Sequence, residues 1–352
     1  MGTLRTGLCV ISAVFGLLPV GFSHAYADSI DELYAKAKLE KTLALYGGGP
    51  PTVYESKVKE FEQKFPGVSV SIISGFSNEL NQQIDTQLRN KKVEVDITFL
   101  QTLQDFVRWE KAGVLLPFKP EGFEQIHPSF KDGNGAFTGV AVTALPYAYN
   151  TELVRPADIP KSAPDFLKPE FRGKFVAVYP HDNDVALYTF YLIAQKYGWG
   201  YMDKLMAYQP NFIQGHPGVI RSIASGQNLV TFDGSLEVQL QFVKQGQPVG
   251  MVFSTVDPTP IWPLSAAIFK QSPHPNAAKL YLTWYLMKEQ QSRTGMWSSR
   301  ADVAAPAGLS PIFSYLVANT YRDFITNEEL VADLRKRFET YTGPIVNKGG
   351  VR

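Results

Sequence analysis

The stretch that decides the fold is residues 43–51, Leu-Ala-Leu-Tyr-Gly-Gly-Gly-Pro-Pro, where a short apolar run ends in glycines and prolines. Such a run predicts a buried β-strand that leads into a loop. The pattern then continues with two more strands and three helices; strands are expected at 43–46, 68–73 and 93–99, and helices at 53–65, 79–90 and 103–112. Because strands that alternate with helices favour a parallel sheet covered on both faces, the expected fold class is α/β.

A second series of the same kind begins near Gly173. Its strands are expected at 174–179, 212–213 and 229–232, and its helices at 184–197 and 218–225. Between the two series lies a long extended stretch, residues 138–149, which contains Pro146. Two α/β series separated by an extended strand indicate two lobes, with a ligand between them.

The N-terminus has the features of a secretory signal. Arg5 precedes an uncharged apolar run at 7–22, and Ala25 and Ala27 match the small-residue pattern of a cleavage site, so residues 1–27 are expected to be removed. The run is shorter than the roughly 20 residues of a membrane span. The single cysteine, Cys9, precedes this site, so neither a lipid anchor nor a disulfide in the mature chain is expected.

The composition excludes several classes of partner. The chain has 34 basic and 33 acidic residues and no basic run, so no nucleic acid is expected to bind. No second long apolar stretch follows the first, so no membrane insertion is expected either. The mature chain is long enough for one or two ordinary cores.

Several short segments carry a family resemblance. They include Phe65-Pro66-Gly67-Val68, Val95-Asp96-Ile97-Thr98 and the stretch from Ser272 to Lys279; the others are 149–153, 171–174, 224–227 and 246–249. Seven such segments, in this order over nearly the whole mature chain, resemble the ABC-transporter periplasmic substrate-binding proteins of the type II periplasmic-binding fold, the broad group of ferric-iron, polyamine and maltose binders.

The resemblance implies two α/β lobes joined by a hinge of crossing strands near 143–146 and 250–254. Lobe one would comprise residues 28–143 with 254–299, and lobe two residues 144–253 with 300–352. A small-molecule ligand would bind in the cleft between them, and closure about the hinge would follow. A monomer in the periplasm, without a cofactor and without enzymatic activity, would then deliver the ligand to a membrane permease.

The expected ligand contacts are on loops at the carboxyl ends of strands, where helix N-termini offer free N–H groups. Aromatic walls with a few polar groups are typical of small-molecule sites. The candidate contacts are Gly48, Gly49, Ser74, Gly75, Phe76, Gln101, Tyr147, Tyr149, Asp182, Phe232, Asp233, Thr259 and Trp262.

The charge of the ligand stays open at this point. Asp233 beside Phe232 suits an ammonium group, to which an aromatic face adds a cation–π contact. The loops at Gly47 and Ser74 suit a carboxylate or a phosphate. An amine, a zwitterion or an organic anion is therefore possible. Two plainer interpretations are that the glycines only form the turn and that the Asp182–Asp184 run caps a helix.

Two alternatives remain beside this interpretation. Ferric-ion binders of the group use adjacent tyrosines after a Ser-Gly segment, whereas the matching stretch 225–234 has none, and four histidines, 127, 181, 216 and 274, lack metal-ligand spacing. A secreted hydrolase is the other alternative. It is disfavoured because the sequence contains no Gly-x-Ser-x-Gly, no His-Glu-x-x-His and no phosphate-binding loop motif.

Overall fold

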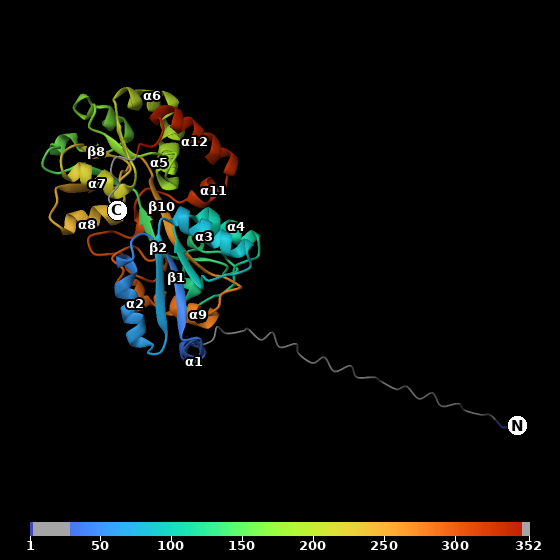
Figure 1. Ribbon diagram of the computed structural model, residues 1–352. Helices are drawn as coiled ribbons and strands as arrows, with labels where there is room; N and C mark the ends of the chain where they lie inside the picture. The colour runs from blue at the N-terminus through green and yellow to red at the C-terminus, as the bar shows by residue number, and fades with distance from the viewer. Residues whose placement is uncertain (3–28, 347–352) are drawn as a thin grey trace.

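The computed structural model describes residues 1–2 and 29–346. The expected signal peptide lies outside the described residues except for its first two, as does its cleavage site. The described chain forms an α/β protein with two bodies, lobe one at the bottom and lobe two at the top of Figure 1.

Lobe one is built around a six-stranded sheet. Its order is β11-β10-β3-β1-β2, with β4 on the other side of β10. The strands β1, β2 and β3 are parallel, whereas β10 runs antiparallel to both β3 and β4. The strands are β1 Thr42–Gly48, β2 Ser69–Gly75, β3 Ile97–Leu100, β4 Thr138–Ala144, β10 Thr259–Ile268 and β11 Val317–Ala318.

The helices of lobe one cover both faces of this sheet. The late helix α9 lies beside α1 and β1 at the bottom of Figure 1, so this lobe combines two distant parts of the chain. The helices are α1 Ile30–Glu40, α2 Thr52–Lys64, α3 Ser77–Arg89, α4 Leu103–Lys111, α9 Pro275–Tyr285 and α10 Lys288–Gln291, with short 3₁₀ turns at Phe123–Gln125, Pro128–Phe130 and Ile312–Ser314.

Lobe two contains a smaller sheet. Its strands pair in the order β9-β5-β8, and a parallel bridge from Phe175 to Val230 continues this sheet toward the parallel pair β6-β7. The strands are β5 Tyr147–Asn150, β6 Val176–Val178, β7 Asn211–Ile213, β8 Val230–Thr231 and β9 Val249–Val252. The helices are α5 Asp184–Tyr197, α6 Trp199–Ala207, α7 His216–Ala224, α8 Leu236–Lys244, α11 Tyr321–Ile325 and α12 Glu328–Thr342, with 3₁₀ turns at Pro156–Asp158, Ala163–Leu167 and Pro169–Phe171.

Three segments cross between the lobes. The first joins β4 to β5 through Leu145 and Pro146, and the second joins β9 to β10 through residues 253–258. The third leads from β11, which pairs with the start of β10, into α11, which contacts α4, α5 and β10. Before this third crossing, residues 300–318 lie against lobe one, where Ile312 shares a core cluster with Trp297.

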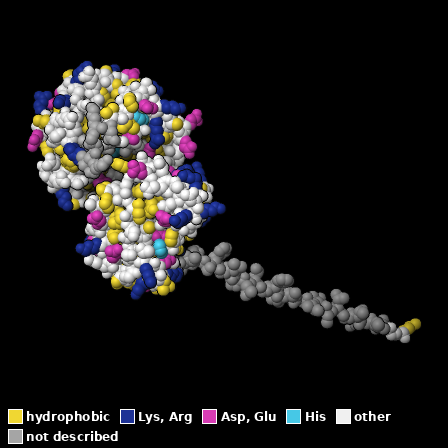
Figure 2. Space-filling model, viewed as in Figure 1, with side chains coloured by type: hydrophobic (Ala, Val, Ile, Leu, Met, Phe, Trp, Pro, Cys, Tyr) yellow, Lys and Arg dark blue, Asp and Glu magenta, His cyan; other side chains and the backbone are white. Residues whose placement is uncertain are grey.

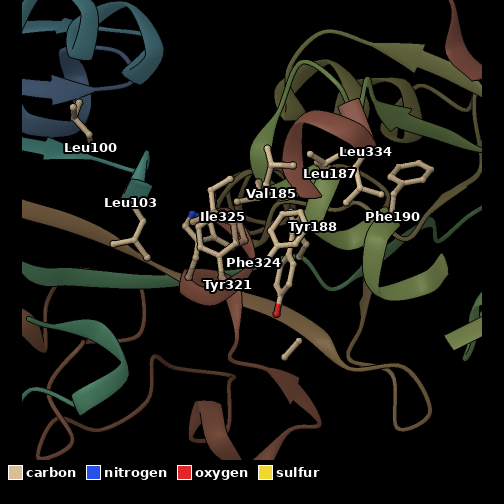
Figure 3. Close-up of a cluster of buried hydrophobic side chains, with 14 of the residues drawn as sticks. Leu100, Leu103, Val185, Leu187, Tyr188, Phe190, Tyr321, Phe324, Ile325 and Leu334 are labelled. Atoms are coloured by element: carbon tan, nitrogen blue, oxygen red, sulfur yellow. The ribbon is translucent and has the colours of Figure 1, made fainter. Parts of the chain in front are cut away.

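An apolar cluster connects the two lobes beside the third crossing (Figure 3). Leu103 of α4 points toward α11, whose Tyr321 and Phe324 pack against Tyr188 of α5 at ring-centroid distances of 5.4 and 4.9 Å. The hydroxyl of Tyr188 also bonds to Thr320 at 2.8 Å. The lobes are thus joined by packed side chains as well as by the crossing strands.

The expected α/β class is confirmed, with two local corrections. Residues 93–96, expected as part of a strand, are irregular, because the buried carboxylate of Asp96 accepts the backbone N–H of Ala44 at 2.7 Å and so takes the place of a ladder bond. Conversely, residues 259–268 were not among the strands expected from the sequence. They contain Pro260 and Pro263, and proline lacks an N–H. Both prolines nevertheless lie in β10.

The distribution of charged side chains on the surface agrees with the nearly equal numbers of basic and acidic residues. Basic and acidic side chains are interspersed over both lobes on the face shown in Figure 2. Within residues 1–2 and 29–346, no helix is long and apolar enough to span a membrane.

Candidate functional site

The candidate site lies where the carboxyl ends of strands from both lobes meet, a region called the interlobe junction below. In lobe one, the loops after β1 and β2 are fixed to each other, because the N–H of Gly49 donates to the carbonyl of Gly75 at 2.8 Å. Gly48 and Gly75 are opposite each other in the parallel ladder. The structure therefore brings together six of the predicted contacts: Gly48, Gly49, Ser74, Gly75, Phe76 and Gln101.

Ser77 belongs to the same edge and was not among the predicted contacts. Its hydroxyl oxygen lies 3.5 Å from the N–H of Gln101, and a Cβ added to Gly48 would approach it to 2.4 Å. Gly48 must therefore remain glycine for the loop and α3 to approach this closely. Phe76, which precedes Ser77, is 73% exposed. The spacing of these residues after β2 was the only sequence signal that could have pointed to Ser77.

The lobe two edge consists of the loops after β6, β7 and β8. Here Asp182 is half-buried, and Asn183 caps α5 by accepting the N–H groups of Val185 and Ala186. The next residue, Asp184, instead accepts a hydrogen bond from Gln104 of lobe one at 2.8 Å and pairs with Arg335. The capping role expected for one of the two aspartates, Asp182 or Asp184, is therefore wrong, because Asn183 between them provides the cap.

The two edges face each other. Ser265 of β10 pairs with Leu100 of β3 on one side and with Gly139 of β4 on the other. Because β3 ends at Leu100 whereas β4 runs on from Gly139 to Ala144, β4 continues past the end of β3 toward lobe two. From lobe two, α8 approaches α2. Burial raises the pKa of Tyr54 in α2, and two nearby groups, Tyr285 of α9 and Glu237 of α8, raise it further.

Six helices begin at these two edges and direct backbone N–H groups toward the junction. The helices α2, α3 and α4 begin at the lobe one edge, and α5, α7 and α8 at the lobe two edge. Of these six, α5 alone has a side-chain cap. Away from the junction, α1 and α12 are capped by Ser29 and Asn327, whereas α6, α9, α10 and α11 also have no side-chain cap. Uncapped N-termini leave N–H donors and a positive dipole end available to an anion.

Five predicted contacts are buried inside the protein: Tyr147, Phe232, Asp233, Thr259 and Trp262. Phe232 has no exposed surface, and its ring packs against Phe175 and Phe190 at 4.8 Å each. Thr259 and Trp262 are 4% exposed in β10 at the third crossing. In this conformation these side chains support the lobes and offer no surface to a ligand. The predicted aromatic wall is therefore corrected to Phe76 and the half-buried Tyr149 of β5.

Tyr147, another of the five, belongs to a buried polar network at the hinge. Its hydroxyl donates to the carboxylate of Asp257 at 2.7 Å, and Asp257 is 2% exposed in the second crossing. The same carboxylate accepts hydrogen bonds from Lys196 at 2.7 Å, Tyr197 at 2.6 Å and the N–H of Ala163 at 2.6 Å. Asp257 therefore attaches the crossing segment to lobe two.

This network predicts a dependence of stability on pH. Although burial opposes ionisation, the hydrogen bonds from Lys196, Tyr197 and Tyr147 lower the pKa of Asp257 below its ordinary value of about 3.9. The stabilisation is complete above the unfolded-state pKa and is lost as the pH falls through the lower folded-state pKa. The difference in Tm between wild type and Asp257→Asn should therefore be largest at neutral pH and shrink below about pH 4. A difference that stays constant down to pH 3 would contradict this explanation.

Two further features lie outside the predicted contacts. Among the described residues, no group of three or more His, Cys, Asp and Glu side chains is placed to hold a metal ion. A pocket of about 410 Å³ opens in lobe one away from the carboxyl ends of β1–β3, and it includes none of the predicted contacts; it is lined by His127, Phe130, residues 297–305 and residues 311–313.

Comparison with known proteins identifies the class of this chain. Residues 57–313 match the model of the family described as bacterial extracellular solute-binding protein, and the chain belongs to that family. Among curated proteins it is similar to a Fe(3+)-binding periplasmic protein of Serratia marcescens, with 21% identity over 271 residues that cover 72% of this chain and 76% of that protein.

Solved structures show the same fold. Iron-bound HitA from Pseudomonas aeruginosa has a TM-score of 0.72 and 19% identity, covering 84% of this chain and 99% of that one. AfuA from Actinobacillus pleuropneumoniae, solved with fructose-6-phosphate, has a TM-score of 0.71 and 20% identity, covering 87% and 100%. The resemblance to two-lobe periplasmic binding proteins is thus confirmed, and at these identities it concerns the fold.

Proposed function

We propose that this protein is the periplasmic component of an ABC importer and that it captures a small organic anion at the interlobe junction for delivery to a permease. The observation that carries the ligand class is the set of five uncapped helix N-termini on the two facing edges. A phosphate or carboxylate group suits such donors. The side chain of Gln101 and the rings of Phe76 and Tyr149 would contact the rest of the ligand.

The relatives support two ligands of different kinds. AfuA is described with a bound sugar phosphate, which agrees with the uncapped N-termini. The relative from Serratia marcescens and HitA are described as iron-binding, so a ferric ion is the second candidate. Against iron, residues 225–234 contain no tyrosine, and the described part of the chain has no cluster of acidic and histidine side chains for a metal.

A thermal-shift comparison tests the proposal. The protein without residues 1–27 is melted with glucose 6-phosphate, with glucose, with spermidine and with ferric citrate. A ligand that binds the folded state alone stabilises it by about 2.7 kcal/mol at a hundredfold excess over Kd. We expect the hexose phosphate to raise Tm by several degrees while glucose and spermidine have little effect. A shift with spermidine alone would refute the anion class, and a coloured complex with ferric citrate would favour iron.

Substitutions of two phenylalanines test where the ligand binds. Phe76 is 73% exposed at the lobe one edge, and Phe313 is 46% exposed at the pocket in lobe one. Phe76→Ala is expected to weaken the response to the hexose phosphate, whereas Phe313→Ala should leave it unchanged. The reverse result would move the ligand site from the junction to that pocket.

A further inference from the structure

The lobe two edge contains a histidine held by a buried carboxylate. His216 is the first residue of α7, and its Nε2 lies 3.0 Å from Oδ1 of Asp233. Asp233 is fully buried and its Oδ2 accepts the N–H of Val178 at 2.9 Å. The Asp233 N–H in turn donates to the hydroxyl of Thr231 at 2.9 Å. Every atom that fixes the carboxylate is thus supplied by lobe two.

This pair lies at the junction because of the topology. Val178 ends β6, His216 follows β7 and Asp233 follows β8. These three strands are parallel, so their carboxyl ends meet at the lobe two edge. One carboxylate therefore connects three loops that face lobe one.

The pair leaves one imidazole nitrogen available. A carboxylate oxygen accepts, so the hydrogen in the bond to Asp233 belongs to Nε2 of His216. Within the described chain, Nδ1 has no hydrogen-bond partner, and the side chain is 12% exposed. A histidine whose second nitrogen is fixed by a carboxylate has a defined tautomer and ring orientation, as in metal and catalytic sites.

Helix α8, which follows the loop after β8, contains a second unpartnered group. Gln239 is fully buried, its Nε2 donates to the carbonyl of Pro146 at 3.3 Å, and its Oε1 has no partner. A Cβ added to Gly234, the residue after Asp233, would approach Gln239 to 2.3 Å. The loop after β8 thus packs directly on the amide nitrogen of Gln239, whose amide oxygen lacks a hydrogen-bond donor.

From this arrangement we infer that His216 is a ligand-contacting residue whose Nδ1 bonds to a hydroxyl or acidic oxygen of the organic anion, and that Asp233 is its positioning residue. The inference rests on the proposed function. Nδ1 accepts from a hydroxyl when the ring is neutral and donates to an acidic oxygen when the ring is protonated. It reverses the earlier interpretation of Asp233, because this carboxylate is fully buried within lobe two and exposes no oxygen to an ammonium group.

A similar pair elsewhere in the protein provides a control. Nδ1 of His274 lies 2.9 Å from Oδ2 of Asp96, which is also fully buried. Asp96 precedes β3 and His274 precedes α9, so this pair lies at the end of lobe one opposite to the junction. The two pairs have the same residue types and similar distances between nitrogen and oxygen, but the pair of His274 and Asp96 lies outside the candidate ligand site.

The test separates the two nitrogens of His216. Gln places its amide NH₂ near the position of Nε2, so His216→Gln keeps a donor for Asp233 and removes Nδ1. Asn reaches only the position of Nδ1, so His216→Asn loses the bond to Asp233. Binding of glucose 6-phosphate is measured by calorimetry, and Tm is measured without ligand.

We expect His216→Gln to keep the Tm of the wild type and to weaken binding about ten- to hundredfold, the effect of one hydrogen bond to a charged group. His216→Asn should lower Tm. His274→Asn, which keeps an amide near the bonded nitrogen of the control pair, should leave binding unchanged. If His216→Gln binds like the wild type, the inference is wrong although the proposed function stands; if the wild type binds no organic anion, both fail.

A double-mutant cycle tests the positioning role of Asp233. Asp233→Asn should weaken binding in the wild type and have a much smaller effect in the His216→Gln background, because contacting pairs are not additive. Equal losses in both backgrounds would show that Asp233 acts only through the stability of lobe two, and would overturn its positioning role.

Discussion

Replacing Asp257 by alanine is expected to lower the free energy of unfolding by about 3–5 kcal/mol, the usual cost of breaking a buried ion pair from one side. The substitution leaves two tyrosine hydroxyls, one backbone N–H and the ammonium group of Lys196 without their common acceptor. Urea unfolding monitored by circular dichroism measures the change. Lys196→Ala should cost less, because Lys196 is 37% exposed and its loss leaves three donors on Asp257.

A matched control lies in the same lobe. Asp158 also forms an ion pair, but its partner Arg155 is 80% exposed. Exposed pairs contribute at most about 1 kcal/mol, so Asp158→Ala should change stability far less than Asp257→Ala. Equal effects of the two substitutions would show that the hinge network contributes no more than a surface pair.

The second large loss of stability is expected for Phe232→Ala. Removing a fully buried aromatic ring costs about 3–5 kcal/mol, since the cavity among Phe166, Phe175 and Phe190 closes only in part. Urea unfolding again provides the measurement.

Phe76→Ala is the comparison for this prediction. The same change at an exposed position should alter stability by no more than about 0.5 kcal/mol while it weakens ligand binding. If Phe232→Ala instead spared stability and abolished binding, Phe232 would have to reach the ligand in a conformation other than the one described.

The sequence predicted the lobe one edge well because the signals there are local. Apolar runs that end at Gly47 and Ser74 locate the strand ends, and parallel pairing then brings the loops together. Phe232 shows the opposite case. Its position after β8 suggested a ligand contact, but its burial depends on Phe166, Phe175 and Phe190, which no local pattern connects to it.

The pairing of His216 could not be predicted from local patterns either. In the sequence, the histidines were considered only as metal ligands. The partner of His216 lies 17 residues along the chain, after a different strand, and the pairing depends on how the ends of β6, β7 and β8 meet. Strand β10 was also not among the expected strands. It contains two prolines, and it pairs with β3 on one side and with β4 on the other.

The position of β10 also limits the order in which the protein can fold during synthesis. Among the described strands, β4 pairs with β10 alone, and β10 fills the place between β3 and β4. Until the ribosome has made residues 259–268, the edges of β3 and β4 are therefore open, and pairing over such long sequence separations is slow. Open strand edges favour association between chains. Nascent chains that stall before residue 259 are the ones that most need a chaperone.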